Sequence, residues 1–148
     1  MKPSTQRPAL GAYRFVTELQ TLYTDEDFHK HINNVAVARY LDEARHRFSQ
    51  ALLAQTGDIS HLRLVTAQAN ISFLAELSHP ATLQVGCAIT RIGSSSYEIG
   101  QGLFQGDRYV SSATTVIVNT GREGARPLTD LLRKTLVLYT LVDQTAES

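Results

Sequence analysis

The stretch NNVAVARYLDEARHRFSQALLAQTG, residues 33–57, predicts one long amphipathic helix around which the rest of the fold must be built. Apolar side chains recur at alternating spacings of four and three residues and form a single helical stripe: Val37, Leu41, Ala44, Phe48 and Ala51. Asn33 is suited to cap the start of this helix, and Gly57 is suited to end it. Such a stripe has to be covered by other elements of the fold.

Five extended segments flank this helix in the sequence. Apolar and polar residues alternate in residues 13–23, and four further segments follow the helix at residues 62–75, 81–92, 96–106 and 108–119. Within 62–75, strict alternation places one set of side chains on a common face: Val65, Ala67, Ala69, Ile71 and Phe73. Pro127 precedes a short helix at residues 129–141. The order predicts an α+β hotdog fold, in which an antiparallel five-stranded sheet wraps around one long central helix and a short C-terminal helix follows.

The composition limits the possible functions. The 148 residues are expected to form a single domain, 1–148, with residues 1–11 and 143–148 loosely ordered. Lysine plus arginine and aspartate plus glutamate both number 14, so no charge excess favours nucleic acid or a membrane surface. No apolar run approaches the ~20 residues that span a bilayer, and none resembles a signal peptide. The lone Cys87 excludes an internal disulfide, reads as a small core residue, and fits a cytoplasmic location.

The sequence at the start of the long helix resembles a known family. The run YTDEDFHKHINNVAVARYLDEAR, residues 23–45, is similar to acyl-CoA thioesterases of the 4-hydroxybenzoyl-CoA thioesterase type, whose pattern reads D-x-D-x-x-G-H-V-N-N before a helix ending E-x-A-R. The matching positions are Asp25, Asp27, His31, Ile32, Asn33, Asn34, Tyr40, Glu43, Ala44 and Arg45. The resemblance extends over about residues 12–130 and implies the hotdog fold. Lys30 departs from it, because the family has glycine there, and a differently shaped loop is therefore expected.

The resemblance implies roles for the residues before the helix. By this resemblance, Asp27 corresponds to the catalytic carboxylate, which acts as general base or nucleophile. The backbone N–H of Asn34 corresponds to the donor that stabilises the oxyanion. His31 either supports the site, by orienting Asp27 or lining the pocket, or is a packed loop residue. Asp25 is expected to order the loop, and His29 is expected at the surface.

Further candidates concern substrate binding. Arg91, Arg122 and Arg126 can pair with the phosphates of CoA, and Lys30 can face the thioester or the CoA. The hydroxyl of Tyr40 can reach the pocket. Glu43 is the fallback carboxylate, because a helix carboxylate performs the hydrolysis in a relative of this fold. No metal site and no cofactor are expected, since alternate positions such as Asp27, His29 and His31 in one loop make a poor ligand set.

The sequence therefore predicts a cytoplasmic thioesterase that cleaves acyl-CoA, or another acyl thioester, to a free acid and CoA. A homodimer or homotetramer is expected, because the family joins the sheets of two protomers and long strands with free edges favour pairing. Two alternatives remain open. One is a non-catalytic hotdog dimer that binds acyl thioesters; the other is a hotdog enoyl-thioester hydratase or dehydratase.

Overall fold

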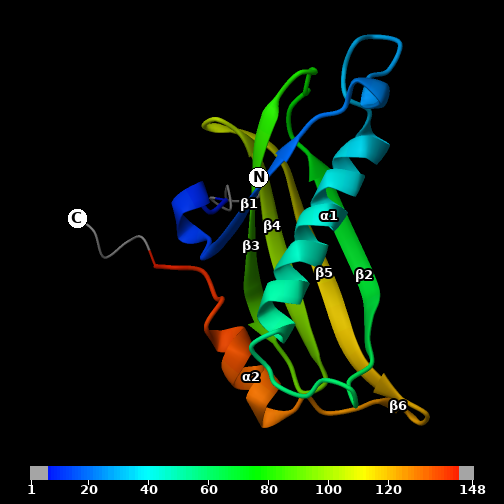
Figure 1. The fold of residues 1–148 in the computed structure, drawn as a ribbon, viewed down its shortest axis with the longest axis vertical. Helices are drawn as coiled ribbons and strands as arrows, with labels where there is room; N and C mark the ends of the chain where they lie inside the picture. The colour runs from blue at the N-terminus through cyan, green and yellow to red at the C-terminus, as the bar shows by residue number, and fades with distance from the viewer. Residues whose placement is uncertain (1–6, 144–148) are drawn as a thin grey trace, which may run out of the picture.

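The computed structural model describes residues 7–143 and shows a curved antiparallel sheet that wraps around one long helix (Figure 1). The chain runs through β1 (Phe15–Gln20), helix α1 (Asn34–Leu53), β2 (Leu64–Phe73), β3 (Thr82–Ile92), β4 (Ser96–Gln105), β5 (Arg108–Gly121), β6 (Gly124–Ala125) and helix α2 (Asp130–Val137). The main strands lie in the order β1-β3-β4-β5-β2, and the two-residue β6 pairs with β5. This architecture confirms the predicted α+β hotdog fold with a five-stranded sheet.

One side of α1 forms the centre of the core. Asn33 caps the helix as predicted, because its side chain accepts a hydrogen bond from the backbone N–H of Ala36. Leu41 and Phe48 are buried against inner-face side chains of the sheet such as Leu103. Burying one leucine or phenylalanine side chain stabilises a fold by about 1.5–3 kcal/mol. The predicted apolar stripe is therefore what holds α1 to the sheet.

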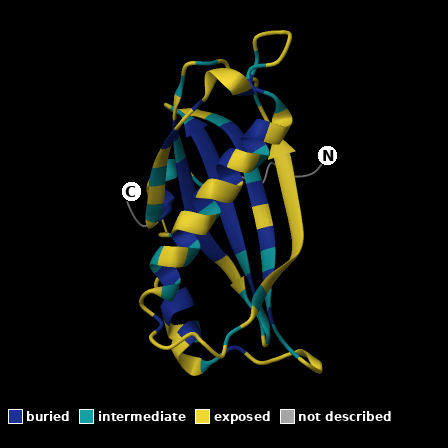
Figure 2. Cartoon of the chain, turned by 45° about the vertical axis from the view of Figure 1, so that its right-hand side comes forward, coloured by how far each residue is buried: buried dark blue, intermediate teal, exposed yellow. Residues whose placement is uncertain are grey.

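Strand β2 forms an edge of the main sheet and differs from the rest in exposure. All of its residues after Leu64 are exposed, as Figure 2 shows beside α1. A bulge between Thr66 and Gln68 shifts its register against β5. Because a shift of one residue turns side chains to the opposite face, Val65 and Ile71 lie on different faces of the sheet. The predicted common face from Val65 to Phe73 is therefore wrong at the bulge.

The two ends of the described chain meet on the outer side of the sheet. Turn η1 (Leu10–Ala12) precedes β1, and the backbone N–H of Val142 bonds to the carbonyl of Ala12. Helix α2 ends at Val137 rather than at residue 141 as predicted, because Leu138 and Tyr139 form a turn and the backbone carbonyl of Tyr139 accepts a hydrogen bond from the N–H of Ile89 on β3. Of the termini expected to be loosely ordered, residues 1–6 and 144–148 lie outside the described residues. Within the described range, no helix is both long and apolar enough to cross a membrane.

Candidate active site

A tight hairpin turn positions Asp27 just before α1. The backbone N–H of Lys30 bonds to the carbonyl of Asp27 at 3.0 Å, and the N–H of Asp27 bonds to the carbonyl of His31 at 2.7 Å. Glu26 and Ile32 form the bridge that closes the hairpin. Lys30 has a φ of 61°, which is the left-handed region that favours glycine. Lys30 therefore adopts a backbone conformation that a glycine takes more readily, and the expectation of a differently shaped loop stays a prediction.

The carboxylate of Asp27 is held by the backbone of its own turn. Its Oδ1 accepts hydrogen bonds from the N–H groups of His29, at 2.9 Å, and His31, at 3.1 Å. The His31 N–H, and after it the His29 N–H, lowers the pKa of Asp27 below its ordinary value against a smaller effect of burial. Oδ2 has no hydrogen-bond partner among residues 7–143. Asp27 thus presents one free oxygen of an ionised carboxylate.

The start of α1 presents free backbone donors next to this turn. The side chain of Asn33 accepts from the N–H of Ala36 at 2.8 Å, and its carbonyl accepts from the N–H of Val37 at 3.1 Å. The N–H groups of Asn34 and Val35 have no partner in the described part of the chain. Unpaired N–H groups carry the positive end of the helix dipole. They can therefore stabilise negative charge that develops on a bound group.

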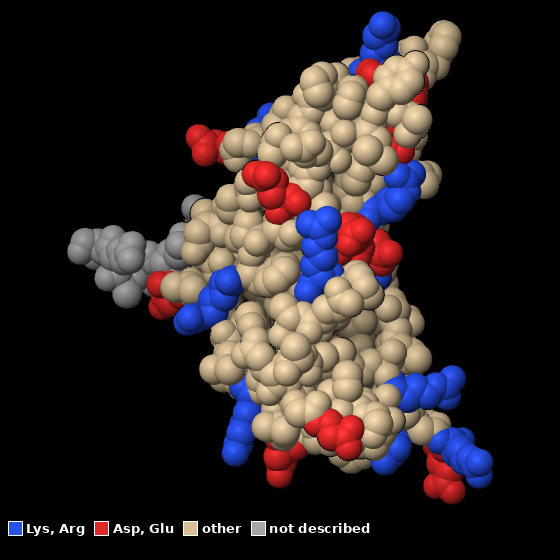
Figure 3. All heavy atoms as spheres, viewed as in Figure 1, with Lys and Arg blue, Asp and Glu red and all other residues tan. Residues whose placement is uncertain are grey.

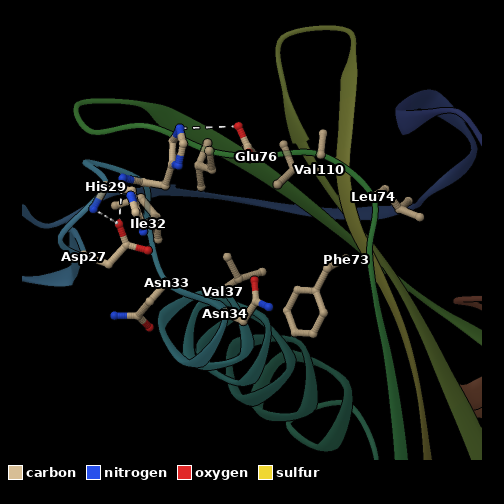
Figure 4. A pocket seen from close by; sticks show the side chains of 13 residues that line it. Asp27, His29, Ile32, Asn33, Asn34, Val37, Phe73, Leu74, Glu76 and Val110 are labelled. Carbon is tan, nitrogen blue, oxygen red and sulfur yellow. Dashed lines mark hydrogen bonds and ion pairs between the residues drawn. The ribbon is translucent and has the colours of Figure 1, made fainter.

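Asp27 and Asn34 line the same cavity, which has a volume of about 510 Å³. Its walls come from the Asp27 turn, the start of α1, the end of β2 with the segment that follows, and Val110 of β5. In Figure 4 the ring of Phe73 faces the helix start beside Asn34 and Val37. One side of the cavity is therefore polar and the other is apolar. This division suits a substrate with a reactive polar group attached to an apolar part.

Asp25 anchors the site turn to the body of α1. Its carboxylate accepts hydrogen bonds from the Tyr40 hydroxyl at 2.7 Å and from Arg39 at 3.0 Å, and its carbonyl accepts from the backbone N–H of Asn33 at 3.1 Å. The Tyr40 hydroxyl, followed by Arg39, lowers the pKa of Asp25, while burial opposes the shift. Asp25 is therefore a structural anchor, as expected. Tyr40 is buried and does not line the Asp27 cavity, so its hydroxyl serves this anchor rather than reaching the pocket.

His31 reaches a carboxylate that the sequence reasoning missed. Its Nε2 lies 3.3 Å from Oε2 of Glu76, and both residues line the cavity (Figure 4). The imidazole is therefore oriented by Glu76, whereas only the backbone N–H of His31 contacts Asp27. Glu76 directly follows the second predicted strand, and the local sequence pattern holds no signal that pairs it with His31. His29, expected at the surface, is exposed and also borders the cavity.

The helix carboxylate named as fallback lies away from the cavity. Glu43 pairs with Arg47 at 3.3 Å, and Arg47 also donates a hydrogen bond of 2.9 Å to the Thr17 hydroxyl on β1. This places Glu43 on the side of α1 that faces β1, whereas the cavity lies toward β2. Cys87 is fully buried, and burial raises the pKa of its thiol to about 12. It is the core residue that the sequence predicted.

The predicted basic residues do not line the Asp27 cavity. Arg91 lies at the end of β3, Arg122 lies in the turn between β5 and β6, and Arg126 follows β6, all at the end of the sheet opposite to the start of α1 (Figure 1). Basic side chains project from this end in the space-filling view (Figure 3). Lys30 borders a separate hollow on the other side of Asp27. Among residues 7–143, no group of three histidine, cysteine, aspartate or glutamate side chains is arranged to hold a metal ion.

Residues 22–135 match the model of a known family, described as the Thioesterase-like superfamily. A protein of Pseudomonas aeruginosa strain PAO1 has a similar structure, with a TM-score of 0.74, 23% identity, and coverage of 93% of this chain and 99% of that chain. A predicted thioesterase from Bacillus stearothermophilus gives a TM-score of 0.74, 22% identity, and coverage of 85% and 96%. A 1,4-dihydroxy-2-naphthoyl-CoA thioesterase from Synechocystis gives 0.72, 18%, and coverage of 83% and 95%. At these identities the likeness shows the fold. No curated protein matches the sequence.

Proposed function

This chain belongs to the thioesterase-like superfamily, and we propose that it hydrolyses acyl-CoA, or another acyl thioester, to the free acid and the thiol. The family supports a thioester hydrolase in general. CoA as the thiol is supported by the name of the Synechocystis relative, which is a CoA thioesterase. The observation that carries the proposal is that the free Oδ2 of ionised Asp27 and the free N–H of Asn34 belong to residues that line one cavity.

The proposed reaction uses these two groups in sequence. The thioester carbonyl oxygen accepts a hydrogen bond from the N–H of Asn34, where the helix dipole stabilises the charge that develops during attack. Oδ2 of Asp27 either removes a proton from the attacking water or attacks the carbonyl carbon itself. The tetrahedral intermediate then expels the thiolate, which takes up a proton. Where Asp27 attacks, water hydrolyses the resulting anhydride and restores the carboxylate.

A homodimer or homotetramer is part of the proposal. Among residues 7–143, strand β2 leaves one backbone edge unpaired and exposes apolar side chains, with Ile71 36% and Phe73 46% exposed. Exposed apolar edge strands are sites of strand pairing between chains. A two-fold axis through the middle of β2 would bring the start of one β2, Leu64, close to the end of the other, Phe73. The proposed site would then lie at the junction of two subunits.

This arrangement would also give a role to Arg122 and Arg126 at the β5–β6 hairpin. Gly121 and Gly124 pair in the β5–β6 hairpin next to the start of β2, so the hairpin of one subunit would lie near the cavity of its partner. Arg122 and Arg126 would then be able to bind the phosphates of CoA by forked hydrogen bonds. Arg91 lies three strands from β2 in the sheet order and has no place in this arrangement. The proposal needs no metal and no cofactor, and it retains a cytoplasmic location.

Release of free thiol from a panel of acyl-CoA esters tests the function. Replacing Asp27→Asn is expected to lower kcat/KM by at least about 100-fold, which is typical for loss of a general base. Asp58→Asn is the matched control, because Asp58 also accepts a backbone hydrogen bond in a turn, from Ser60, but lies beyond the other end of α1. Its kcat/KM should equal that of the wild type.

The same assay separates the alternatives. Absence of thiol release by the wild type, with measurable binding of acyl-CoA, would favour a non-catalytic binding module. Hydration of an enoyl-CoA without thiol release would favour a hydratase. Undiminished hydrolysis by Asp27→Asn would remove Asp27 from the mechanism. Light scattering of the full chain should give at least twice the mass of one 16.3 kDa subunit if the assembly is as proposed.

A further inference from the structure

A second cavity lies on the outer face of the sheet, on the opposite side from α1. It has a volume of about 220 Å³ and is bordered by the N-terminal segment, the C-terminal segment and strands β2 to β5. The residues that shape it are Arg7, Tyr13, Gly100, Tyr109, Ser112 and Thr114. The Asp27 cavity shares none of its lining residues. Nothing in the proposed thioester chemistry uses this place.

The floor of this outer cavity is flat because small residues from three neighbouring strands stand side by side. Asn70 of β2 pairs with Thr114 of β5, which pairs with Gly100 of β4. In the next row with this orientation, Ser72, Ser112 and Gly102 are aligned in the same way. Paired residues in a sheet point to the same face. These two rows therefore present the hydroxyl and amide side chains of β2 and β5, while Thr90 covers Gly100 and Tyr109 covers Gly102.

Two tyrosines form the wall, and glycines make room for them. A Cβ atom on Gly86 would lie 2.4 Å from the Tyr13 ring, and one on Gly102 would lie 2.5 Å from the Tyr109 hydroxyl. The two tyrosine hydroxyls are 3.1 Å apart and share one hydrogen bond, so one hydroxyl hydrogen remains available. Leu141 and Pro8 add apolar contacts. The wall thus offers aromatic surface with a polar tip.

Arg7 supplies the only charge at this cavity among the described lining residues, none of which is acidic. Its Nε donates a long hydrogen bond of 3.4 Å to the Ser112 hydroxyl, while its two terminal nitrogens have no partner within residues 7–143. A guanidinium group carries five N–H donors in a planar fork that matches a carboxylate. The cavity therefore combines a mainly apolar lining with a cation that is free to bind an anion.

We propose that this outer cavity is a binding site for a small aromatic carboxylic acid, whose ring lies on the flat floor beside Tyr13 and Tyr109 and whose carboxylate pairs with Arg7. The size fits one ring, since an apolar cavity of about 150 Å³ is known to hold benzene. Aromatic rings gain from edge or offset contact with tyrosine rings. The proposal does not depend on the thioesterase activity.

Benzoate is the probe, titrated into the full isotope-labelled chain and followed by amide chemical shifts. The amides of Gly100, Gly102, Ser112 and Thr114 are expected to move. Benzamide, which keeps the ring but lacks the charge, should bind about tenfold more weakly, because a charge-assisted hydrogen bond contributes roughly the 1.4 kcal/mol that corresponds to tenfold. Shifts confined to the Asp27 cavity, for example at Asn34, would overturn the proposal, as would no shifts at all.

Two variants test the assignment of the contacts. Arg7→Gln should weaken benzoate binding about tenfold and leave benzamide unchanged, whereas Arg14→Gln, an exposed arginine outside the cavity, should change neither. Thr114→Phe should fill the floor and abolish binding of both probes. Thr114 is exposed, so this variant should keep the unfolding midpoint of the wild type. Equal affinity of wild type, Arg7→Gln and Thr114→Phe for benzoate would place the ligand elsewhere and end the proposal.

Discussion

The hydroxyl of Tyr40 donates a hydrogen bond of 2.7 Å to the Asp25 carboxylate. Tyr40 lies in the second turn of α1, and Asp25 ends the short turn η2 (Tyr23–Asp25) two residues before Asp27. The contact therefore fixes the Asp27 turn relative to the helix start. It also links the two parts of the candidate site, the carboxylate and the free N–H groups, through one buried interaction.

Removing the Tyr40 hydroxyl should loosen this link. Tyr40→Phe is expected to lower the free energy of unfolding by about 1.5–3 kcal/mol, the range for hydrogen bonds to charged groups, because Asp25 stays buried. Tyr97→Phe is the matched control, since Tyr97 is equally buried but its hydroxyl has no hydrogen bond within residues 7–143. Urea unfolding measures both. Equal losses in the two variants would show that the contact with Asp25 contributes nothing.

Acid should weaken the same anchor. The Tyr40 hydroxyl and then Arg39 depress the folded-state pKa of Asp25 below the unfolded value of about 3.9. A depressed pKa contributes stability that is present above the unfolded pKa and is lost as the pH falls through the folded pKa. The wild type should therefore lose stability below about pH 4 more steeply than Asp25→Asn. Urea midpoints between pH 2.5 and 6 measure this, and parallel curves would contradict it.

The fold could be predicted largely because its signals are local. The spacing of Val37, Leu41 and Phe48 defines the helix face, and Asn33 defines its start, without reference to the rest of the chain. The bulge near Ala67 was not predictable in this way. Alternation of apolar and polar residues along one strand does not reveal that β2 has one extra residue in its pairing with β5. The early end of α2 was missed for a similar reason. The pairing of Tyr139 with Ile89, 50 positions apart in sequence, decides it.

The site could be predicted only in part. The motif places Asp27 and Asn34 near each other because both flank the same helix start. It does not show that the Tyr40 side chain turns to Asp25, or that Glu43 faces β1, because these depend on how the helix is rotated against the sheet. Glu76 reaches His31 from a distant segment of sequence. Such contacts arise from tertiary packing, which local patterns do not encode.

Lys30 should carry a backbone cost. Its φ of 61° is left-handed, which costs a non-glycine residue roughly 1–2 kcal/mol. Lys30→Gly is therefore expected to raise the free energy of unfolding by about 0.5–1 kcal/mol, after the larger chain entropy of glycine is subtracted. Gly106→Ala is the reciprocal control, because Gly106 has a φ of 59° and free space around an added Cβ, and it should lose a similar amount. A loss in Lys30→Gly would mean that the lysine side chain stabilises the turn.

Cys87 should be inert in the folded protein. It is fully buried, and burial raises the pKa of its thiol to about 12, so almost no thiolate forms near neutral pH. Iodoacetamide at pH 8 should label the chain only in urea, and Cys87→Ala should keep the native kcat. Mass spectrometry measures the labelling of Cys87. The thiol-release assay measures the kcat of Cys87→Ala, with a thiol detector that does not respond to alkylated cysteine. Rapid labelling of the native protein would place Cys87 at an accessible site instead.

The fall of kcat/KM at low pH should reflect protonation of the Asp27 carboxylate. The N–H of His31, and then that of His29, lower the pKa of this carboxylate, so it stays ionised below the ordinary aspartate value of about 3.9. Activity that requires the ionised form should persist as the pH falls and decline only through the lowered pKa. Short assays after a pH jump, with folding checked by circular dichroism, measure kcat/KM before acid unfolding. A limb near pH 6.5 would instead indicate histidine control, and His31→Gln would then shift it. Persistence of a low limb in His31→Gln would assign it to the carboxylate.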